Sequence, residues 1–221
     1  MREKVALICR NSNSFVEKLL EIWEKNNIAL LIDTLSTIEN IKKIICAEHI
    51  TKAYVDSRYS SVILALTVLN VHIKCIYVES TSCEQLKGIN YMRFQCKYTD
   101  DPAVVFFSSG TTDNAKGVVL SHNAINRNAN KIKTYMQADE NKTIGIIKSL
   151  VHSSTLVGEL LVALKSKMKL FFINSVSPSI ILKHIQKQNI NIVCLNPALL
   201  QILSVLQEQK NIYLMHWKKY M

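Results

Sequence analysis

The sequence is poor in residues that interrupt regular structure and in patterns that bind metal ions. Its 221 residues include only 5 glycines and 3 prolines, which excludes collagen-like chains and glycine- or proline-rich low-complexity chains. No two of its 6 cysteines stand in a CxxC pattern, which excludes zinc ribbons and thioredoxin-type redox motifs. We therefore expect no metal site, and free thiols in a reducing cytoplasm.

Long apolar runs are also missing. The longest, residues 60–72, is shorter than the roughly 18–20 residues that a membrane-spanning helix needs. The N-terminus has no apolar core of the kind that marks a secretory signal, so we expect no membrane span and a cytoplasmic protein. Because hydrophobic residues make up 48% of the chain and charged residues 20%, the composition excludes intrinsic disorder and allows a sizeable core.

Acidic residues are scarce in the second half of the chain. Residues 1–112 contain 13 Lys or Arg and 12 Asp or Glu, whereas residues 113–221 contain 14 and 5, and the formal net charge is +10. A basic half can face phosphates or an acidic partner surface, and a solvated lysine-rich surface is the simpler explanation. The lysines are scattered and do not alternate with aromatic residues, so we expect no nucleic-acid partner.

Short apolar runs typical of strands alternate with segments whose apolar residues recur at helical spacing. This alternation predicts an α/β fold with layered, largely parallel sheets flanked by helices. Strands are expected at 5–9, 29–32, 53–55, 73–78, 103–107, 117–120, 143–147, 168–173 and 191–195, and helices at 15–23, 38–45, 61–69, 123–136, 155–164, 179–188 and 197–206. Ser14 is the expected N-cap of the first helix. Residues 80–101 break the alternation and mark an expected subdomain boundary.

One segment between two predicted strands combines hydroxyl groups, glycines and a lysine. Hydroxyl and backbone N–H groups donate hydrogen bonds to phosphate oxygens, and a lysine adds positive charge. The spacing is not that of a Walker A loop, and the loop does not open a helix as a Rossmann turn does. A Ser/Thr/Gly run between strands is by itself often only a turn. The candidate phosphate-binding residues are Ser108, Ser109, Gly110, Thr111, Thr112, Lys116 and Gly117.

The whole string from Asp101 to His122 resembles the phosphate-binding signature of the adenylate-forming (AMP-binding) enzymes. That superfamily contains acyl-CoA synthetases, the adenylation domains of peptide synthetases and the luciferases. Residues 4–16, 149–164 and 180–203 resemble other segments of the same family, so the resemblance covers nearly the whole chain. The residues of this segment favour the acyl-CoA synthetases, including those of fatty acid metabolism, over the amino-acid adenylation domains. The resemblance implies that residues 1–221 form part of the family's N-terminal domain.

The resemblance also implies an activity. Enzymes of this family join ATP and a carboxylic acid into an acyl-adenylate, release pyrophosphate, and pass the acyl group to the thiol of CoA or of a carrier protein's phosphopantetheine. The candidate loop would then hold the β- and γ-phosphates of ATP, which Mg²⁺ bridges, and Gly117 would let the chain turn into the next strand. His152 would be an accessory residue near the acyl pocket; a satisfied, half-buried histidine is the alternative.

The sequence also departs from the family pattern. Asp113 and Ala115 stand where the family usually has Gly and Pro. The glutamate that helps to bind Mg²⁺, the aspartate that holds the ribose, and the C-terminal domain with its catalytic lysine have no counterpart here. We therefore expect the front part of a truncated or split ligase with no catalytic residue of its own, and a second polypeptide as a candidate partner. The alternatives are a nucleotide- or polyphosphate-binding module and a non-functional remnant.

Three further residues are expected to have structural roles. Trp23 lies on the apolar face of a predicted helix and is expected in the core. His122 follows the second strand of the candidate loop, where a hydrogen-bonding role is more common than catalysis. Cys194 lies in an apolar strand and is expected to be a small buried hydrophobe.

Overall fold

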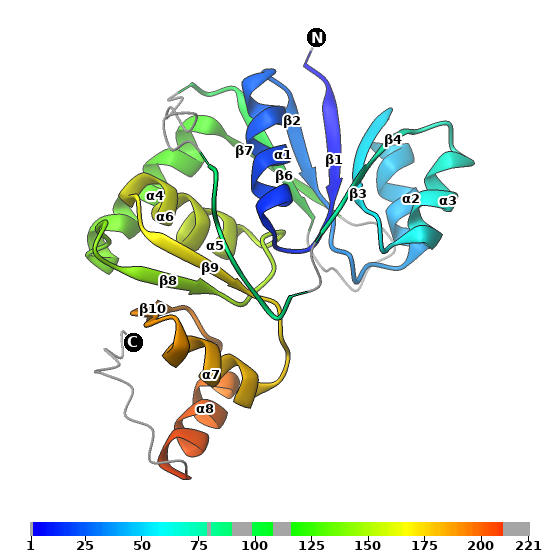
Figure 1. The fold of residues 1–221 in the computed structure, drawn as a ribbon. Coiled ribbons are helices and arrows are strands. Elements are labelled where there is room, and N and C mark those ends of the chain that lie inside the picture. The colour runs from blue at the N-terminus through cyan, green and yellow to red at the C-terminus, as the bar shows by residue number, and fades with distance from the viewer. Residues whose placement is uncertain (1, 79–80, 90–98, 108–115, 210–221) are drawn as a thin grey trace.

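Two sheets form the framework of the protein (Figure 1). The computed structural model describes residues 2–78, 81–89, 99–107 and 116–209. The first sheet, called sheet A, has the strand order β4-β3-β1-β2-β6-β7. Its strands are β1 (Lys4–Ile8), β2 (Ile28–Leu31), β3 (Lys52–Asp56), β4 (His72–Ile76), β6 (Pro102–Phe107) and β7 (Gly117–Ser121). All neighbours in sheet A are parallel except β6 and β7, which form an antiparallel pair.

The second sheet, called sheet B, has the order β10-β8-β9-β5. Its strands are β5 (Cys83–Gln85), β8 (Thr143–Ile146), β9 (Lys169–Ile173) and β10 (Ile192–Val193). Strand β8 pairs in parallel with both β9 and β10, and β5 joins β9 in antiparallel fashion. The segment between β4 and β6, both in sheet A, therefore contributes a strand to sheet B.

Helices fill the space between the sheets and cover their outer faces (Figure 1). The middle layer holds α1 (Asn13–Glu24), α4 (His122–Met136) and a continuous helical segment made of α5 (Ser153–Thr155), the π-helical turn η2 (Leu156–Leu161) and α6 (Val162–Ser166). Helices α2 (Ile38–Ala47) and α3 (Ser60–Thr67) cover the other face of sheet A, and α7 (Pro178–Lys187) and α8 (Pro197–Gln209) cover the other face of sheet B.

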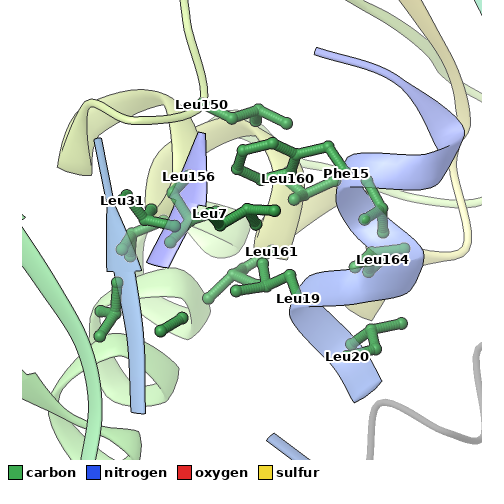
Figure 2. Close-up of a cluster of buried hydrophobic side chains, with 14 of the residues drawn as sticks. Leu7, Phe15, Leu19, Leu20, Leu31, Leu150, Leu156, Leu160, Leu161 and Leu164 are labelled. Atoms are coloured by element: carbon green, nitrogen blue, oxygen red, sulfur yellow. The ribbon is translucent and has the colours of Figure 1, made fainter. Parts of the chain in front are cut away.

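The largest hydrophobic core lies in the middle layer. Leu7 of β1 and Leu31 of β2 meet Phe15 and Leu19 of α1, and leucines of η2 pack against the same group (Figure 2). Helix α1 forms because its apolar residues recur at helical spacing, and all of Phe15, Val16, Leu19, Leu20, Ile22 and Trp23 are buried. Burial of this much apolar surface is the main stabilising term of the fold. The core therefore couples the two sheets through the helices between them.

The predicted fold class is confirmed, but two local expectations are wrong. The N-cap of α1 is Ser12, whose Oγ accepts a hydrogen bond from the N–H of Phe15 at 3.0 Å, whereas Ser14 Oγ donates to the carbonyl of Tyr77. Strand β5 was not expected within residues 80–101, because its sequence Cys-Glu-Gln carries no apolar alternation. Its place in the sheet comes from pairing with β9. In the described part of the chain, no helix is long and apolar enough to cross a lipid bilayer.

Candidate functional site

The candidate phosphate loop joins the antiparallel strands β6 and β7 at one edge of sheet A. Phe107 pairs with Gly117, so the two ends of the loop lie side by side. Ser108, Ser109, Gly110, Thr111 and Thr112 lie outside the described residues, as do Asp113 and Ala115. The structure thus describes the base of the hairpin, with Lys116 and Gly117 at its second strand, and both of these residues are exposed.

Gly117 has little free space around it. A Cβ atom at this position would lie 3.0 Å from Val105 Cγ1, 3.3 Å from a ring carbon of Phe107 and 3.4 Å from Glu48 Oε1. Its backbone is not left-handed, so the feature of the structure that favours glycine here is close packing against β6. A side chain here would crowd the Val105 and Phe107 side chains of β6, and these would have to shift.

The base of the hairpin is fixed to the middle layer. Trp23 Nε1 donates a hydrogen bond to the carbonyl of Ala103 on β6 at 2.8 Å. The ring of His122 contacts that of Trp23 edge to face, with centroids 5.6 Å apart, and the backbone N–H of His122 donates to the carbonyl of Asp101 at 3.0 Å. Trp23 and His122 are both buried, which confirms the core position expected of Trp23.

The loop after β8 carries His152, the candidate accessory residue. His152 is exposed, so the alternative of a half-buried histidine is wrong. It occupies the N-cap position of α5, but its side chain makes no capping hydrogen bond. The backbone N–H of His152 donates to the carbonyl of Ser149 at 3.2 Å, which closes the loop between β8 and α5. Its imidazole is therefore available to a ligand.

Asn11 ties this loop to the end of β1. Its Nδ2 donates to the carbonyl of Lys148 at 2.8 Å, and its Oδ1 accepts from the N–H of Leu150 at 2.8 Å. A residue in a parallel sheet bonds in the same way to the two residues that flank its neighbour, so the buried Asn11 amide acts as an additional strand residue beside Ser149. The carbonyl of Asn11 also accepts from Asn174 Nδ2 at 3.2 Å. Sequence reasoning did not identify this role.

A buried acid lies beneath the same loop. Glu159, in the middle of η2, is 1% exposed, and Lys148 Nζ lies 3.0 Å from its Oε1. Within the described residues its other carboxylate oxygen, Oε2, has no hydrogen-bond partner. Burial raises the pKa of Glu159 to about 7, and Lys148 opposes the shift. Glu159 stands in an apolar helix, where a single acid gives no pattern in the sequence.

Cys194 lies just after β10 and is an electrostatic neighbour of Glu159. It is half-buried, less so than expected, and burial raises its pKa to about 11. The thiol is therefore protonated at neutral pH and is a poor nucleophile. No group of three or more His, Cys, Asp or Glu within the described ranges is arranged to hold a metal ion.

A second buried acid lies at the end of a strand of sheet A. Asp56 ends β3 and is fully buried. Arg58 donates to it from Nε at 3.3 Å and from its backbone N–H at 3.1 Å, and Arg10 Nε lies 3.5 Å from the other oxygen. Arg10 follows β1, the neighbour of β3, so the cluster sits at the carboxyl end of sheet A.

Comparison with known proteins shows one family. A sequence profile described as AMP-binding enzyme matches residues 1–220. A curated relative, the malonate–CoA ligase of Arabidopsis thaliana, is 28% identical over 113 residues, which cover 49% of this chain and 15% of the ligase.

Solved structures share the fold. The N-terminal domain of FACL13 from Mycobacterium tuberculosis has a TM-score of 0.76 at 16% identity, covering 91% of this chain and 52% of that one. A long-chain-fatty-acid–CoA ligase from Archaeoglobus fulgidus has a TM-score of 0.75 at 19% identity, covering 94% and 42%. ATP-bound MatB from Rhodopseudomonas palustris has a TM-score of 0.70 at 17% identity, covering 92% and 41%. The chain thus spans about half, or less, of the proteins that it matches.

Proposed function

Because this chain belongs to the AMP-binding enzyme family, we propose that it contains the site that binds the phosphates of ATP in an ATP-dependent acid–thiol ligase. The observation that carries the proposal is the β6–β7 hairpin, whose connecting loop has the sequence of a phosphate-binding signature and whose base holds Lys116 and Gly117. Ligation of this kind activates a carboxylic acid as an acyl-adenylate and transfers the acyl group to CoA or to phosphopantetheine.

Each loop residue has a proposed role in this reaction. Ser108, Ser109, Thr111 and Thr112 donate hydrogen bonds to the β- and γ-phosphates, and Gly110 lets the backbone approach them. Lys116, exposed at the base of the hairpin, places a positive charge where negative charge grows on the departing pyrophosphate. Mg²⁺ is held largely by phosphate oxygens in such sites, which suits a loop of hydroxyl groups, and it would add further positive charge to the phosphates.

The acid is proposed to bind near the loop after β8. His152 is exposed there, and Asn11 holds the loop's backbone against the end of β1. The relatives are named for malonate and for long-chain fatty acids, so at this stage the proposal specifies a carboxylic acid only. The described cysteines are free thiols, which suits the reducing cytoplasm where we place the reaction.

Turnover is proposed to need more than this chain. The matched proteins are about twice as long or longer. Within residues 116–206 one acid is fully buried, and this residue, Glu159, lies in the core. The chain would act when joined to the family's remaining segments, in the same polypeptide or as a second polypeptide bound to this one. A polyphosphate-binding module without catalysis is the second candidate, because it needs only the hairpin.

ATP–pyrophosphate exchange separates these candidates. We expect no exchange by residues 1–221 alone with a panel of carboxylic acids, and exchange when the C-terminal part of a related ligase is added. Exchange by the chain alone would contradict the need for further segments. If neither sample exchanges but the chain binds MgATP, the binding module is the better account.

A further inference from the structure

Sheet B has a topological switch point between β8 and β10. The chain leaves β8, adds β9 on one side, and then places β10 on the other side of β8. In open parallel sheets, ligands bind in the crevice outside the carboxyl ends of the strands at such a point. Lys148 follows β8 and Cys194 follows β10, so these two residues stand at the switch point.

Lys148 is the charged residue that sheet B presents there. Its side chain is 35% exposed, so its stem is largely covered while part of the side chain reaches solvent. Its backbone is held by the hydrogen bond from Asn11 Nδ2. Its ammonium group is held from below by Glu159, which lies 3.0 Å away and is 1% exposed. An ammonium group has three donors, and Glu159 approaches it from one side only.

Glu159 leaves Lys148 incompletely neutralised. Oε2 of Glu159 has no hydrogen-bond partner among the described residues, and burial raises the pKa of this carboxyl to about 7. Near neutral pH part of the protein therefore carries an uncharged Glu159 beneath a charged Lys148. The Cys194 thiol is in electrostatic contact with both members of this pair, and its raised pKa keeps it uncharged.

We propose that Lys148 is a specificity residue that binds a second carboxylate on the acid substrate, so that this site favours short dicarboxylic acids over monocarboxylic acids. The inference rests on the proposed function, because it assumes that the acid binds beside the β8–α5 loop that also carries His152. Glu159 is a positioning residue: it holds the ammonium group in place and, being buried, does not itself touch the acid.

Malonate and propionate make a matched pair of probes, since both have three carbons and only malonate has a second carboxylate. We expect malonate to bind the chain about tenfold more tightly than propionate in an NMR titration, which is the effect of about one charge-assisted hydrogen bond. Lys148→Met should abolish the preference. Lys142→Met, a control at the opposite end of β8 where the lysine pairs with Asp139, should keep it.

Glu159→Gln keeps an oxygen that can accept from the Lys148 ammonium group, so the group stays in place, and it removes the charge that competes with the acid; malonate should therefore bind this variant more tightly than the parent. If Lys148→Met fails to fold because it leaves Glu159 without a counter-charge, the double variant Lys148→Met/Glu159→Gln removes both charges and should still lack the preference. Equal affinity of the parent for the two acids, or a preference that survives loss of Lys148, would overturn the inference.

MgATP binding is measured on the same samples. Lys148 is not part of the phosphate loop, so Lys148→Met should bind MgATP as the parent does. A missing malonate preference with intact MgATP binding overturns only the role of Lys148. Failure of the parent to bind MgATP overturns the proposed function itself.

Discussion

The two sheets each place a buried carboxylate near their switch point and neutralise it differently. In sheet A the switch point lies between β1 and β3, and Asp56 there contacts two guanidinium groups, those of Arg10 and Arg58. In sheet B, Glu159 contacts one ammonium group, that of Lys148. Burial raises the pKa of both carboxyl groups, and that of Glu159 reaches about 7.

This difference indicates a different use of the two sites. Asp56 has hydrogen bonds from both the backbone and the side chain of Arg58, as expected of a charge that holds loops together. Glu159 retains an oxygen without a partner in the described part of the chain, and a buried polar group without a partner destabilises the folded state. An unsatisfied buried group in a folded protein needs an explanation, and functional sites are where such departures are expected.

The largest effect is expected from Asp56→Asn. In the variant one carboxylate oxygen becomes an amide donor that faces a guanidinium donor, so a charge-assisted hydrogen bond is lost and a buried donor has no partner, which costs about 3 kcal/mol. Urea denaturation measures the change. Asp139→Asn, which breaks the exposed pair with Lys142, is the control and should cost less than about 1 kcal/mol. Equal stability of the two variants would contradict the claim that Asp56 and its two arginines stabilise the fold.

Glu159 makes the folded state less stable as the pH rises. Its pKa in the folded state is about 7 against an ordinary value of 4.5, so the folded state binds the proton more tightly than the unfolded state does. Stability from this group is fully present below about pH 4.5, falls between pH 4.5 and 7, and then levels off. The fall is about 3 kcal/mol. Denaturant titrations at several pH values give the free energy of unfolding, which should fall with pH more steeply for the parent than for Glu159→Gln. The same pH dependence in both proteins would show that Glu159 has an ordinary pKa.

Asn11 connects the end of β1, at the switch point of sheet A, to the β8–α5 loop at the switch point of sheet B. Asn11→Ala should loosen this connection. The variant removes both side-chain hydrogen bonds to the β8–α5 loop and should cost about 2 kcal/mol. Amide hydrogen exchange should increase most at residues 148–152. Asn174→Ala, which removes one hydrogen bond to the Asn11 carbonyl, is the control and should have a smaller effect. Unchanged exchange in that loop would mean that Asn11 does not hold it.

The smallest effect is expected at the N-termini of the two helices that follow β1 and β8. Ser12 caps α1 after β1, whereas His152 at the start of α5 makes no capping bond. Ser12→Ala should therefore cost about 1 kcal/mol, and both His152→Ala and Ser14→Ala should cost less. Thermal unfolding of the three variants measures this. A larger loss at Ser14 than at Ser12 would restore the N-cap expected from the sequence.

Most of the layered fold could be predicted from the sequence, because apolar runs of strand length alternate with helical periods. The two strands that flank the candidate loop were predicted from their apolar runs, their antiparallel pairing was not, and the family resemblance is confirmed. Strand β5 was missed because three polar residues become a strand only by pairing with β9. Asn11 was missed because its partners lie more than 130 residues away in the sequence.

The candidate loop itself remains a prediction from sequence for the residues between Phe107 and Lys116. Glu159 shows why buried polar sites are hard to predict: one acid inside an apolar helix has the same appearance in a sequence as an acid on a surface. Only packing shows that η2 is enclosed by the core on all sides.

Isothermal titration of MgATP into the chain and into Lys116→Ala tests the central claim most directly. Lys116 is exposed and its replacement leaves the core untouched, so a change in affinity measures its contribution to phosphate binding. We predict that the parent binds MgATP and that the variant binds at least about tenfold more weakly, as expected for loss of one charge-assisted contact. Equal affinities, or no binding by the parent, would contradict the assignment of this hairpin as an ATP-phosphate site.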